Sequence, residues 1–435
     1  MSRIPDETTS ALGAHLYELV AELTPAMRSI TGNGVRRTLA TVRRALDPAV
    51  PLTVREIPTD TPVLDWTVPK EWNVREAWLA GPDGQRILDV ADHPLHLVNY
   101  SAPTYTRLAL PDLAPHLHSL PDRPDWVPYR TSYYRETWGF CLPDRQRRAL
   151  AEGEYQVHID TTLTDGSLTF AEILLPGSGP LEFLLTTHVC HPGMANDNAS
   201  GIAMATLLAG ALADRPRRLT YRILFIPGTI GAITWLAHNR HAVEQVEHGL
   251  VLTGLGDRGQ PTYKRSRRGD AVIDRAATRA LKETDRPHHV VDFSPYGYDE
   301  RQFCSPGFNL PVGRFGRSQH GEYPEYHTSA DNMDLVTPES LGDSFAIIMR
   351  TIEICERDRT WTNTSPFGEP QLGRRGLYRS IGATLGRDAV EMGLLWVLNL
   401  ADGTNSMLDI AERADLPFDT VADAADALAA VGLLT

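Results

Sequence analysis

Apolar and polar positions follow the period of a helix at the start of the chain. Between residues 11 and 46 apolar side chains recur at every third or fourth position, which predicts two helices. The turn-rich segment 29–34, Ser-Ile-Thr-Gly-Asn-Gly, separates them and could cap the second helix.

The pattern becomes short and strand-like over residues 54–138. Apolar runs at 76–80 and 85–90 flank a Gly-Pro-Asp-Gly turn, which predicts a β-hairpin. Prolines and aromatic residues are dense after residue 120. We expect residues 54–138 to form a small β-rich domain inserted into a larger one.

Strands alternate with helices in the middle of the chain. The apolar runs have the lengths of buried strands, at 181–187, 221–227 and 250–253, and of a helix, at 201–212. This alternation predicts an α/β fold with a mixed, mostly parallel sheet sandwiched by helices. With the first two helices, it would occupy residues 1–53 and 139–356.

The last part of the chain predicts a separate helical module. A polar stretch containing Pro, Gly and Ser, residues 357–375, is typical of a linker. Apolar positions then favour three helices, at 394–398, 407–414 and 418–431. Because three helices suit a winged helix, we expect a winged-helix-like module over residues 376–435.

Composition narrows the class of protein. The chain has 435 residues, of which 42% are hydrophobic and 22% charged, ordinary values for a soluble globular protein. We find no run of the roughly 20 apolar residues that a membrane-spanning helix needs. The start, MSRIPDETTS, lacks the apolar core of a secretory signal, and the four cysteines are far apart. We expect a cytoplasmic protein without a membrane partner.

The net charge of −13 argues against a nucleic-acid partner, because phosphate contact needs a basic face. The last predicted helix carries Asp419, Asp423 and Asp426 and no lysine or arginine. Phosphates would repel such a recognition helix. We interpret the module as a docking or oligomerisation element, through which the protein could form a homo-oligomer.

Two polar clusters carry the candidate chemistry. In the first, His188 leaves a predicted strand and Asp197 opens the following helix, so an imidazole and a carboxylate meet at one sheet edge. Zinc accepts both ligand types. Alternatively, Asp197 or Asn198 is a plain helix cap and His188 a core histidine. The second cluster, at 323–332, contains His327, which alone could be a packing site in a loop.

Together the clusters resemble the co-catalytic zinc exopeptidases of the aminopeptidase type. The resemblance rests on Asp-Asn-Ala-Ser-Gly at 197–201, after a strand-end histidine, and on His-Thr-Ser-Ala-Asp at 327–331. It covers roughly residues 156–353 and the first helices. The whole chain looks more like an uncharacterised subgroup, with a β-domain insertion and a winged-helix-like module, that is often linked to polysaccharide or metabolite biosynthesis.

The chain departs from this family at two ligand positions. Two adjacent glutamates, a general base and a metal ligand, are replaced by Gly228-Thr229, and a later aspartate by Leu252-Thr253-Gly254. The resemblance then leaves His188, Asp197 and His327, an open three-ligand set that implies one zinc per chain. His191 is expected to support these ligands rather than bind the metal, because Pro192 follows it in a sharp turn.

Hydrolysis also needs a group that takes the proton of the attacking water. Glu300 is the preferred base, because it lies near a segment that faces the metals in the resembling family. Asp299 is expected to face the site beside it, and Glu322 and Glu325 are rivals for the role of base. Any of these carboxylates could instead bind a substrate ammonium, or could equally be solvated acids. Arg130 could meet a substrate carboxylate.

The resulting hypothesis is a zinc-dependent hydrolase of aminopeptidase type. It would cleave an amide bond next to a free amino group in a short peptide or an amino-acylated small molecule. Two alternatives stay open: a peptidase-fold binding or scaffold protein without catalysis, and a hydrolase of a non-peptide amide or ester in a biosynthetic pathway.

Overall fold

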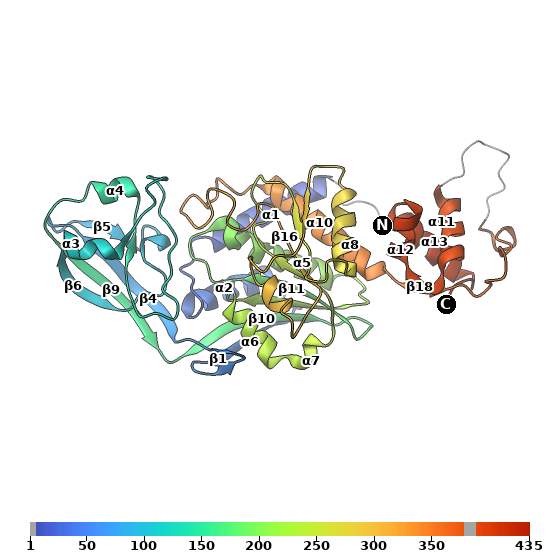
Figure 1. Cartoon of the computed structure of the whole chain (residues 1–435), viewed down its shortest axis with the longest axis horizontal. Helices are drawn as coiled ribbons and strands as arrows, with labels where there is room; N and C mark the ends of the chain where they lie inside the picture. Colours follow the sequence, from blue (N-terminus) through green and yellow to red (C-terminus); the bar gives the residue numbers. More distant parts are fainter. Residues whose placement is uncertain (1–5, 378–388) are drawn as a thin grey trace.

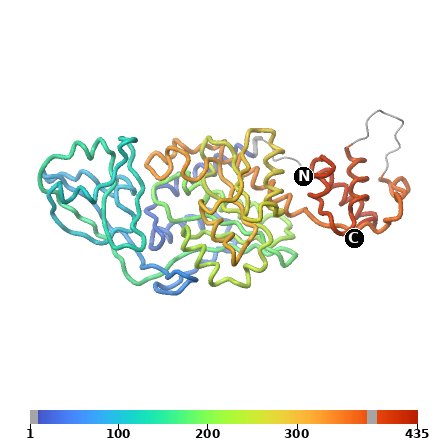
Figure 2. The backbone as a smooth tube through the Cα atoms, in the orientation of Figure 1, coloured from blue at the N-terminus to red at the C-terminus, as the bar shows by residue number. Residues whose placement is uncertain are grey.

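The computed structural model describes residues 6–377 and 389–435. Residues 1–5 of the predicted α/β domain and residues 378–388 of the predicted C-terminal module lie outside the described residues. Three units follow one another along the long axis of the molecule: a β-rich domain, a central α/β domain and a C-terminal helical module (Figures 1 and 2). The predicted fold class, mixed α/β with a β-rich insertion and a winged-helix-like module, is confirmed.

The central domain is built on an eight-stranded mixed sheet in the order β1-β10-β12-β11-β13-β16-β14-β15. Its strands are β1 (Leu52–Pro58), β10 (Ser167–Leu175), β11 (Glu182–His188), β12 (Thr220–Ile226), β13 (Val246–Leu252), β14 (Thr262–Lys264), β15 (His289–Val291) and β16 (Val312–Gly316). The central strand β11 runs parallel to both neighbours, β12 and β13. Its carboxyl end is therefore the position at which parallel α/β sheets place their chemistry.

Helices cover both faces of this sheet because successive strand residues point to opposite sides. On one face Phe183 and Leu185 pack in a core with α1 (Asp6–Leu23), α2 (Asn33–Ala45), α5 (Ser200–Ala213), α8 (Val272–Lys282) and α10 (Pro338–Arg357). On the other face Leu184 packs with residues of α6 (Ile230–His238), α7 (Arg240–Val243) and α9 (Glu300–Phe303). The sheet thus lies between two apolar cores.

The inserted domain is larger than the sequence predicts. Its four-stranded sheet has the order β5-β4-β9-β6, with β4 (Glu71–Ala80), β5 (Arg86–Asp89), β6 (Thr104–Ala109) and β9 (Glu154–Thr164). The predicted hairpin is β4 and β5, which pair antiparallel. However, β1 belongs to the central sheet and β9 to the insertion, so the boundaries at 54 and 138 fall inside these domains. Short elements complete the domain: β2 (Pro62–Val63), β3 (Trp66–Thr67), β7 (Leu117–His118), β8 (Phe140–Cys141), α3 (Leu110–Leu113) and α4 (Asp144–Arg148).

The C-terminal module contains α11 (Ala389–Leu400), β18 (Asp402–Ser406), α12 (Met407–Ala414) and α13 (Phe418–Ala430). Strand β17 (Thr360–Thr362) pairs antiparallel with β18, so part of the predicted linker 357–375 is a structural element of the module. The apolar residues of the module join the core beneath α8 and α10. The module is therefore packed on the central domain rather than tethered to it.

Acidic residues of α13 face arginines of α10. Arg357 forms ion pairs with Asp419 (3.3 Å), Asp423 (2.6 Å) and Asp426 (3.0 Å), and Arg350 forms one with Asp419 (3.0 Å). The acidic side chains of α13 therefore form ion pairs between the C-terminal module and the central domain. Docking to another molecule and oligomerisation both stay predictions for this module.

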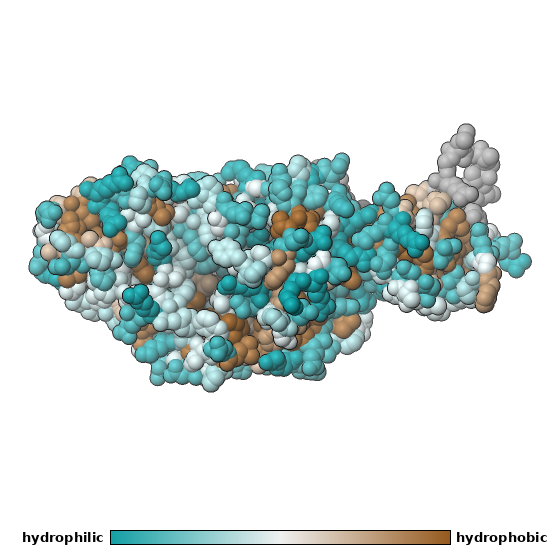
Figure 3. Space-filling model, viewed as in Figure 1, coloured by the Kyte–Doolittle hydropathy of each residue, from teal (hydrophilic) through white to brown (hydrophobic). Residues whose placement is uncertain are grey.

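The surface facing the viewer in Figure 3 is mostly hydrophilic, and its apolar side chains gather in small, separate patches. In the described part of the chain, every helix is too short or too polar to cross a membrane.

Candidate metal centre

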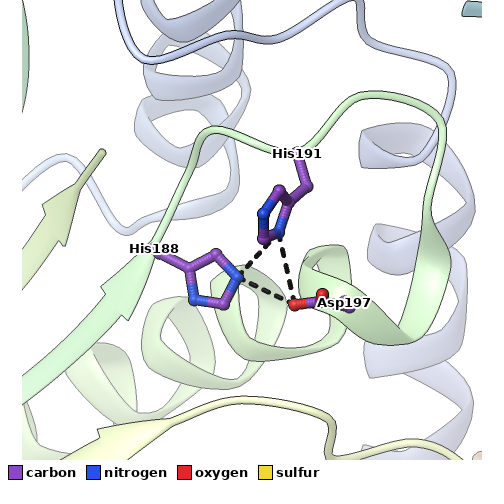
Figure 4. A group of neighbouring side chains, drawn as sticks. All are labelled: His188, His191 and Asp197. Carbon is purple, nitrogen blue, oxygen red and sulfur yellow. Dashed lines mark hydrogen bonds and ion pairs between the residues drawn. The ribbon is translucent and has the colours of Figure 1, made fainter. Parts of the chain in front are cut away.

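The first polar cluster lies at the carboxyl end of the central strand. His188 is the last residue of β11, the chain turns through His191, and Asp197 follows just before α5 (Figure 4). Figure 4 shows the two imidazoles and the carboxylate pointing at one another. Arg28 fixes the turn, because its Nε donates to the carbonyl of His191 at 2.7 Å.

Three ligand atoms converge on a single position. The Nε2 atom of His188 lies 2.8 Å from Oδ1 of Asp197 and 3.0 Å from Nδ1 of His191. His191 Nδ1 and Asp197 Oδ1 are 3.3 Å apart. Zinc binds nitrogen and oxygen at about 2.0–2.2 Å, so tetrahedral ligands lie roughly 3.4 Å from one another. The donor set and its spacing therefore fit a zinc ion.

The second cluster meets the first from the other side of the carboxylate. His327 Nε2 lies 3.1 Å from Oδ2 of Asp197, so the two oxygens of Asp197 face different imidazoles. His327 has a φ of 56°, an uncommon conformation for a residue with a side chain. Its ring stacks on Tyr326 with 3.8 Å between centroids. Such over-determined strain is typical of functional sites.

The structure brings together His188, Asp197 and His327, as predicted, and it adds His191 to them. The sequence-based interpretation gives His191 a supporting role, yet its Nδ1 lies 3.0 Å from Nε2 of His188 and 3.3 Å from Oδ1 of Asp197. Residues 188, 191 and 197 form the group whose ligand atoms all lie within 4.8 Å of one another. His327 stands beside this group on the remaining oxygen.

Protonation states of the cluster favour metal ligation. Burial works to raise the pKa of Asp197, but His191, His188 and His327 hold it well below the usual value. Burial lowers the pKa of His191 and of His327. The carboxylate is therefore ionised and these imidazoles neutral at pH 7, the forms that bind a metal.

Asp331 of the matching 327–331 segment holds the loop that carries Asp197. Its carboxylate accepts from the backbone amides of Asn196 (2.6 Å) and Asp197 (2.9 Å). The side chain of Asp331 is fully buried. It positions a ligand of the cluster from the protein side, as the outer shell of a metal site does.

The inserted domain covers the cluster. The Tyr129 ring lies edge-on to His191 and to His327, at centroid distances of 5.3 and 5.0 Å. Its backbone amide donates to the carbonyl of His327 at 2.8 Å, and Pro128 forms an isolated β-bridge with Thr328. One wall of the site thus comes from a different domain.

Gly228 and Thr229 lie directly beside the cluster. A Cβ at position 228 would be 3.3 Å from the Cys190 sulfur and 3.7 Å from the Cβ of His188. The Thr229 amide donates to Oδ1 of Asp299 at 2.6 Å. A carboxylate from a distant segment is therefore held at the turn where the resembling family has its two glutamates.

Asp299 has the ionisation of a proton acceptor. Burial raises its pKa to about 7; the Thr229 amide opposes this and the neighbouring Glu300 charge adds to it. Glu300, the preferred base from sequence, is fully buried in an ion pair with Lys264 (2.9 Å) and accepts from the Tyr298 amide (3.0 Å). Because the charge of Glu300 is neutralised by Lys264, Asp299 suits the role of base better than Glu300.

The other predicted residues lie at the margin. Glu322 is exposed and Glu325 half-buried, in the segment that precedes His327. Arg130 is exposed next to Tyr129; burial lowers the pKa of the half-buried His118, and the charge of Arg130 adds to this effect. Among the residues that the structure describes, neither glutamate forms an ion pair.

Tyr298, His320 and Tyr326 form an aromatic wall beside the cluster that the sequence does not predict. The ring of Tyr298 stacks on His188 at 5.1 Å and lies edge-on to His320 at 4.4 Å. Tyr326 lies edge-on to His320 at 5.0 Å. The dense Tyr and His content of 296–327 is a signal that could have pointed to it.

Comparisons with known proteins agree with this fold. A family described as a domain of unknown function, DUF4910, matches residues 17–358, and a winged helix-turn-helix family matches residues 359–435. The chain belongs to the DUF4910 family. This member carries the winged helix after the family domain, and the match at 359 agrees with the place of β17 in the module.

Relatives of this DUF4910 protein extend the comparison. It is 44% identical over 428 residues, 98% of each chain, to a Clostridium acetobutylicum protein named as a candidate polysaccharide biosynthesis protein with an aminopeptidase-like domain. A crystal structure of a candidate peptidase from Clostridium acetobutylicum matches with a TM-score of 0.92 and 43% identity, covering 99% of this chain and 97% of the other. A zinc aminopeptidase from Bacillus subtilis matches with a TM-score of 0.60 and 14% identity, covering 79% and 95%. The fold is that of the M28-like zinc aminopeptidases.

Proposed function

We propose that this DUF4910 protein is a zinc-dependent hydrolase of an amide bond in a short peptide or amino-acylated small molecule. The observation that carries the proposal is the convergence of His188 Nε2, His191 Nδ1 and Asp197 Oδ1 at the end of the central strand. His327, on the second oxygen of Asp197, completes the residues that would hold the ion. The peptidase-like fold supports the hydrolase class.

A zinc ion in this position would polarise the scissile carbonyl and acidify the attacking water. The residues of the chain supply the rest. Asp299 takes the proton from the water, and its pKa of about 7 suits a base at neutral pH. Asp331 keeps Asp197 in place, and Tyr129 closes one side of the site against solvent.

The nature of the substrate follows from the walls. Tyr129, Tyr298 and Tyr326 surround the cluster closely, which favours a small molecule over a folded protein. Cleavage next to a free amino group stays a prediction, with Glu322 and Glu325, in the segment that precedes His327, as candidate partners of the amino group. The name of the Clostridium acetobutylicum relative makes a biosynthetic substrate the second candidate.

The decisive experiment measures metal content and turnover together. Protein purified without added metal should contain about one zinc per chain, and His327→Ala should reduce it. Asp299→Asn should keep the zinc and lose turnover of aminoacyl amides. Zinc-free protein that takes up no zinc on reconstitution would contradict the proposal and favour a binding or scaffold role.

A further inference from the structure

A buried arginine beside the candidate metal centre contacts the ring of Tyr298, but within the described residues it has no hydrogen-bond or ion-pair partner. Arg314, on β16, is only 3% exposed, and its Nε is buried without a hydrogen bond. Within the described residues we find no hydrogen bond or ion pair to its guanidinium. Burying a charged group without a partner costs several kcal/mol, so such groups are rare and commonly functional.

The other buried arginines of the domain show what is missing. Arg317, on the same stretch of chain, donates to Asp343 (3.0 Å) and to the carbonyl of Gly259 (2.9 Å). Arg222 pairs with Glu182 at 2.6 Å. The fold therefore satisfies these two guanidinium groups with carboxylates and the buried Arg28 with backbone carbonyls, and it gives Arg314 neither.

Arg314 lies next to the cluster that would hold the metal. Its guanidinium carbon is 5.7 Å from the centroid of the Tyr298 ring, and Tyr298 in turn stacks on His188. The charge of Arg314 also reaches His320, where it adds to the effect of burial in lowering the pKa to about 4. Tyr298 and His320 thus separate Arg314 from the metal ligands by about one ring.

The nearest candidate carboxylate is already engaged. Lys264 is the cross-strand neighbour of Arg314 in the β14–β16 pair, so the two cations lie side by side. Glu300 binds Lys264 at 2.9 Å and neutralises it. One positive charge, that of Arg314, remains uncompensated in this wall.

We propose that Arg314 binds an anionic group of the substrate, a carboxylate or a phosphate, next to the bond that is cleaved. The planar guanidinium matches either oxyanion with paired hydrogen bonds. The inference rests on the proposed hydrolase function and specifies its substrate class: a small amide that carries a negative charge. Arg314 then has the role that the sequence suggests for Arg130, binding a negatively charged group of the substrate. Arg130 is exposed on the inserted domain.

Calorimetric titration of zinc-free protein tests the anion site apart from any turnover. The probes are N-acetylglycine, its neutral analogue N-acetylglycinamide, and glycerol phosphate. Wild type should bind at least one of the two anions more tightly than the amide. Arg314→Gln should reduce that preference about 10- to 100-fold, the value of hydrogen bonds to a charged group. Arg314→Lys should restore part of it.

The matched control is Arg268→Gln, an exposed arginine that donates to a backbone carbonyl. It should bind all three probes as wild type does. Tighter binding of N-acetylglycine would indicate a substrate carboxylate, and tighter binding of glycerol phosphate would indicate a substrate phosphate. An unchanged preference in Arg314→Gln, or equal binding of anions and amide by wild type, would overturn the proposal. Absence of zinc binding would defeat the proposed hydrolase without affecting this result.

A stability measurement gives a second test. Arg314→Met removes the unpaired charge but keeps much of the side-chain volume, so the ligand-free variant should melt about 2–4 °C higher than wild type. Melting at a temperature lower by the same amount would mean that the fold itself needs the guanidinium, and would contradict the proposal.

Discussion

Removing the His191 imidazole should weaken zinc binding strongly. Its Nδ1 lies 3.0 Å from His188 Nε2 and 3.3 Å from Asp197 Oδ1, so it occupies one corner of the ligand set. Structural zinc sites with four ligands bind the ion with about 10–16 kcal/mol, or roughly 3 kcal/mol for each ligand, and we take this value for one imidazole of the candidate site. His191→Ala should therefore raise the zinc dissociation constant by about 10²-fold.

The assay is competition for zinc between the protein and a fluorescent chelator at pH 7. Alanine keeps the carbonyl that accepts from Arg28, so the turn around residue 191 should survive the substitution. His238→Ala, at an exposed histidine on α6, is the control and should bind zinc as wild type does. If His191→Ala bound zinc with unchanged affinity, His191 would only support the ligands, and the set His188, Asp197 and His327 would stand alone.

Three further predictions address the base, the buried ion pair and the C-terminal module. Asp299→Asn should lower kcat by about 10²- to 10⁴-fold. Wild-type activity should fall as the pH drops below the pKa of Asp299, which is about 7 without zinc and lower with zinc bound, because the base must be ionised. The variant should lose this acidic limb of the pH–rate profile, and an unchanged limb would exclude Asp299 as the base. Glu182→Ala leaves the buried Arg222 short of one carboxylate and should cost about 3–5 kcal/mol in denaturant unfolding, whereas Glu154→Ala at an exposed pair should cost about 1 kcal/mol or less. Arg357→Ala removes three partly exposed ion pairs to α13 and should accelerate hydrogen exchange in α13, most clearly at low salt; equal exchange in variant and wild type would mean that apolar packing alone holds the module.

Element identity could be predicted from the sequence more reliably than element partnership. The apolar run at 181–187 is strand β11, and the periodic segment 407–414 is helix α12. The predicted boundary at residue 138 places β9 in the central domain, whereas the strand pairs with β4 of the inserted domain. Alternation of apolar residues indicates which face of a strand is buried but not which sheet the strand joins. Strand β17 was included in a linker because three residues carry no period.

The candidate site shows the same division. His188, Asp197 and His327 could be found because they stand in short ordered motifs. The sequence predicts only a supporting role for His191, because the direction of a side chain just before a Pro-Gly turn depends on backbone angles that the residue order does not specify. Arg314 could not be found at all: an arginine within the strand 312–316 looks the same in sequence whether it meets a carboxylate or nothing.

The wall supplied by Tyr129 makes the metal centre a joint between two domains. The Tyr129–His327 backbone bond and the bridge between Pro128 and Thr328 tie the tip of the inserted domain to the segment that carries a ligand. Swinging the insertion away would break these bonds and pull on His327. An ion held by these residues would then oppose separation of the two domains, because His327 would have to leave it. Under the proposed hydrolase function, this favours compact substrates over long chains.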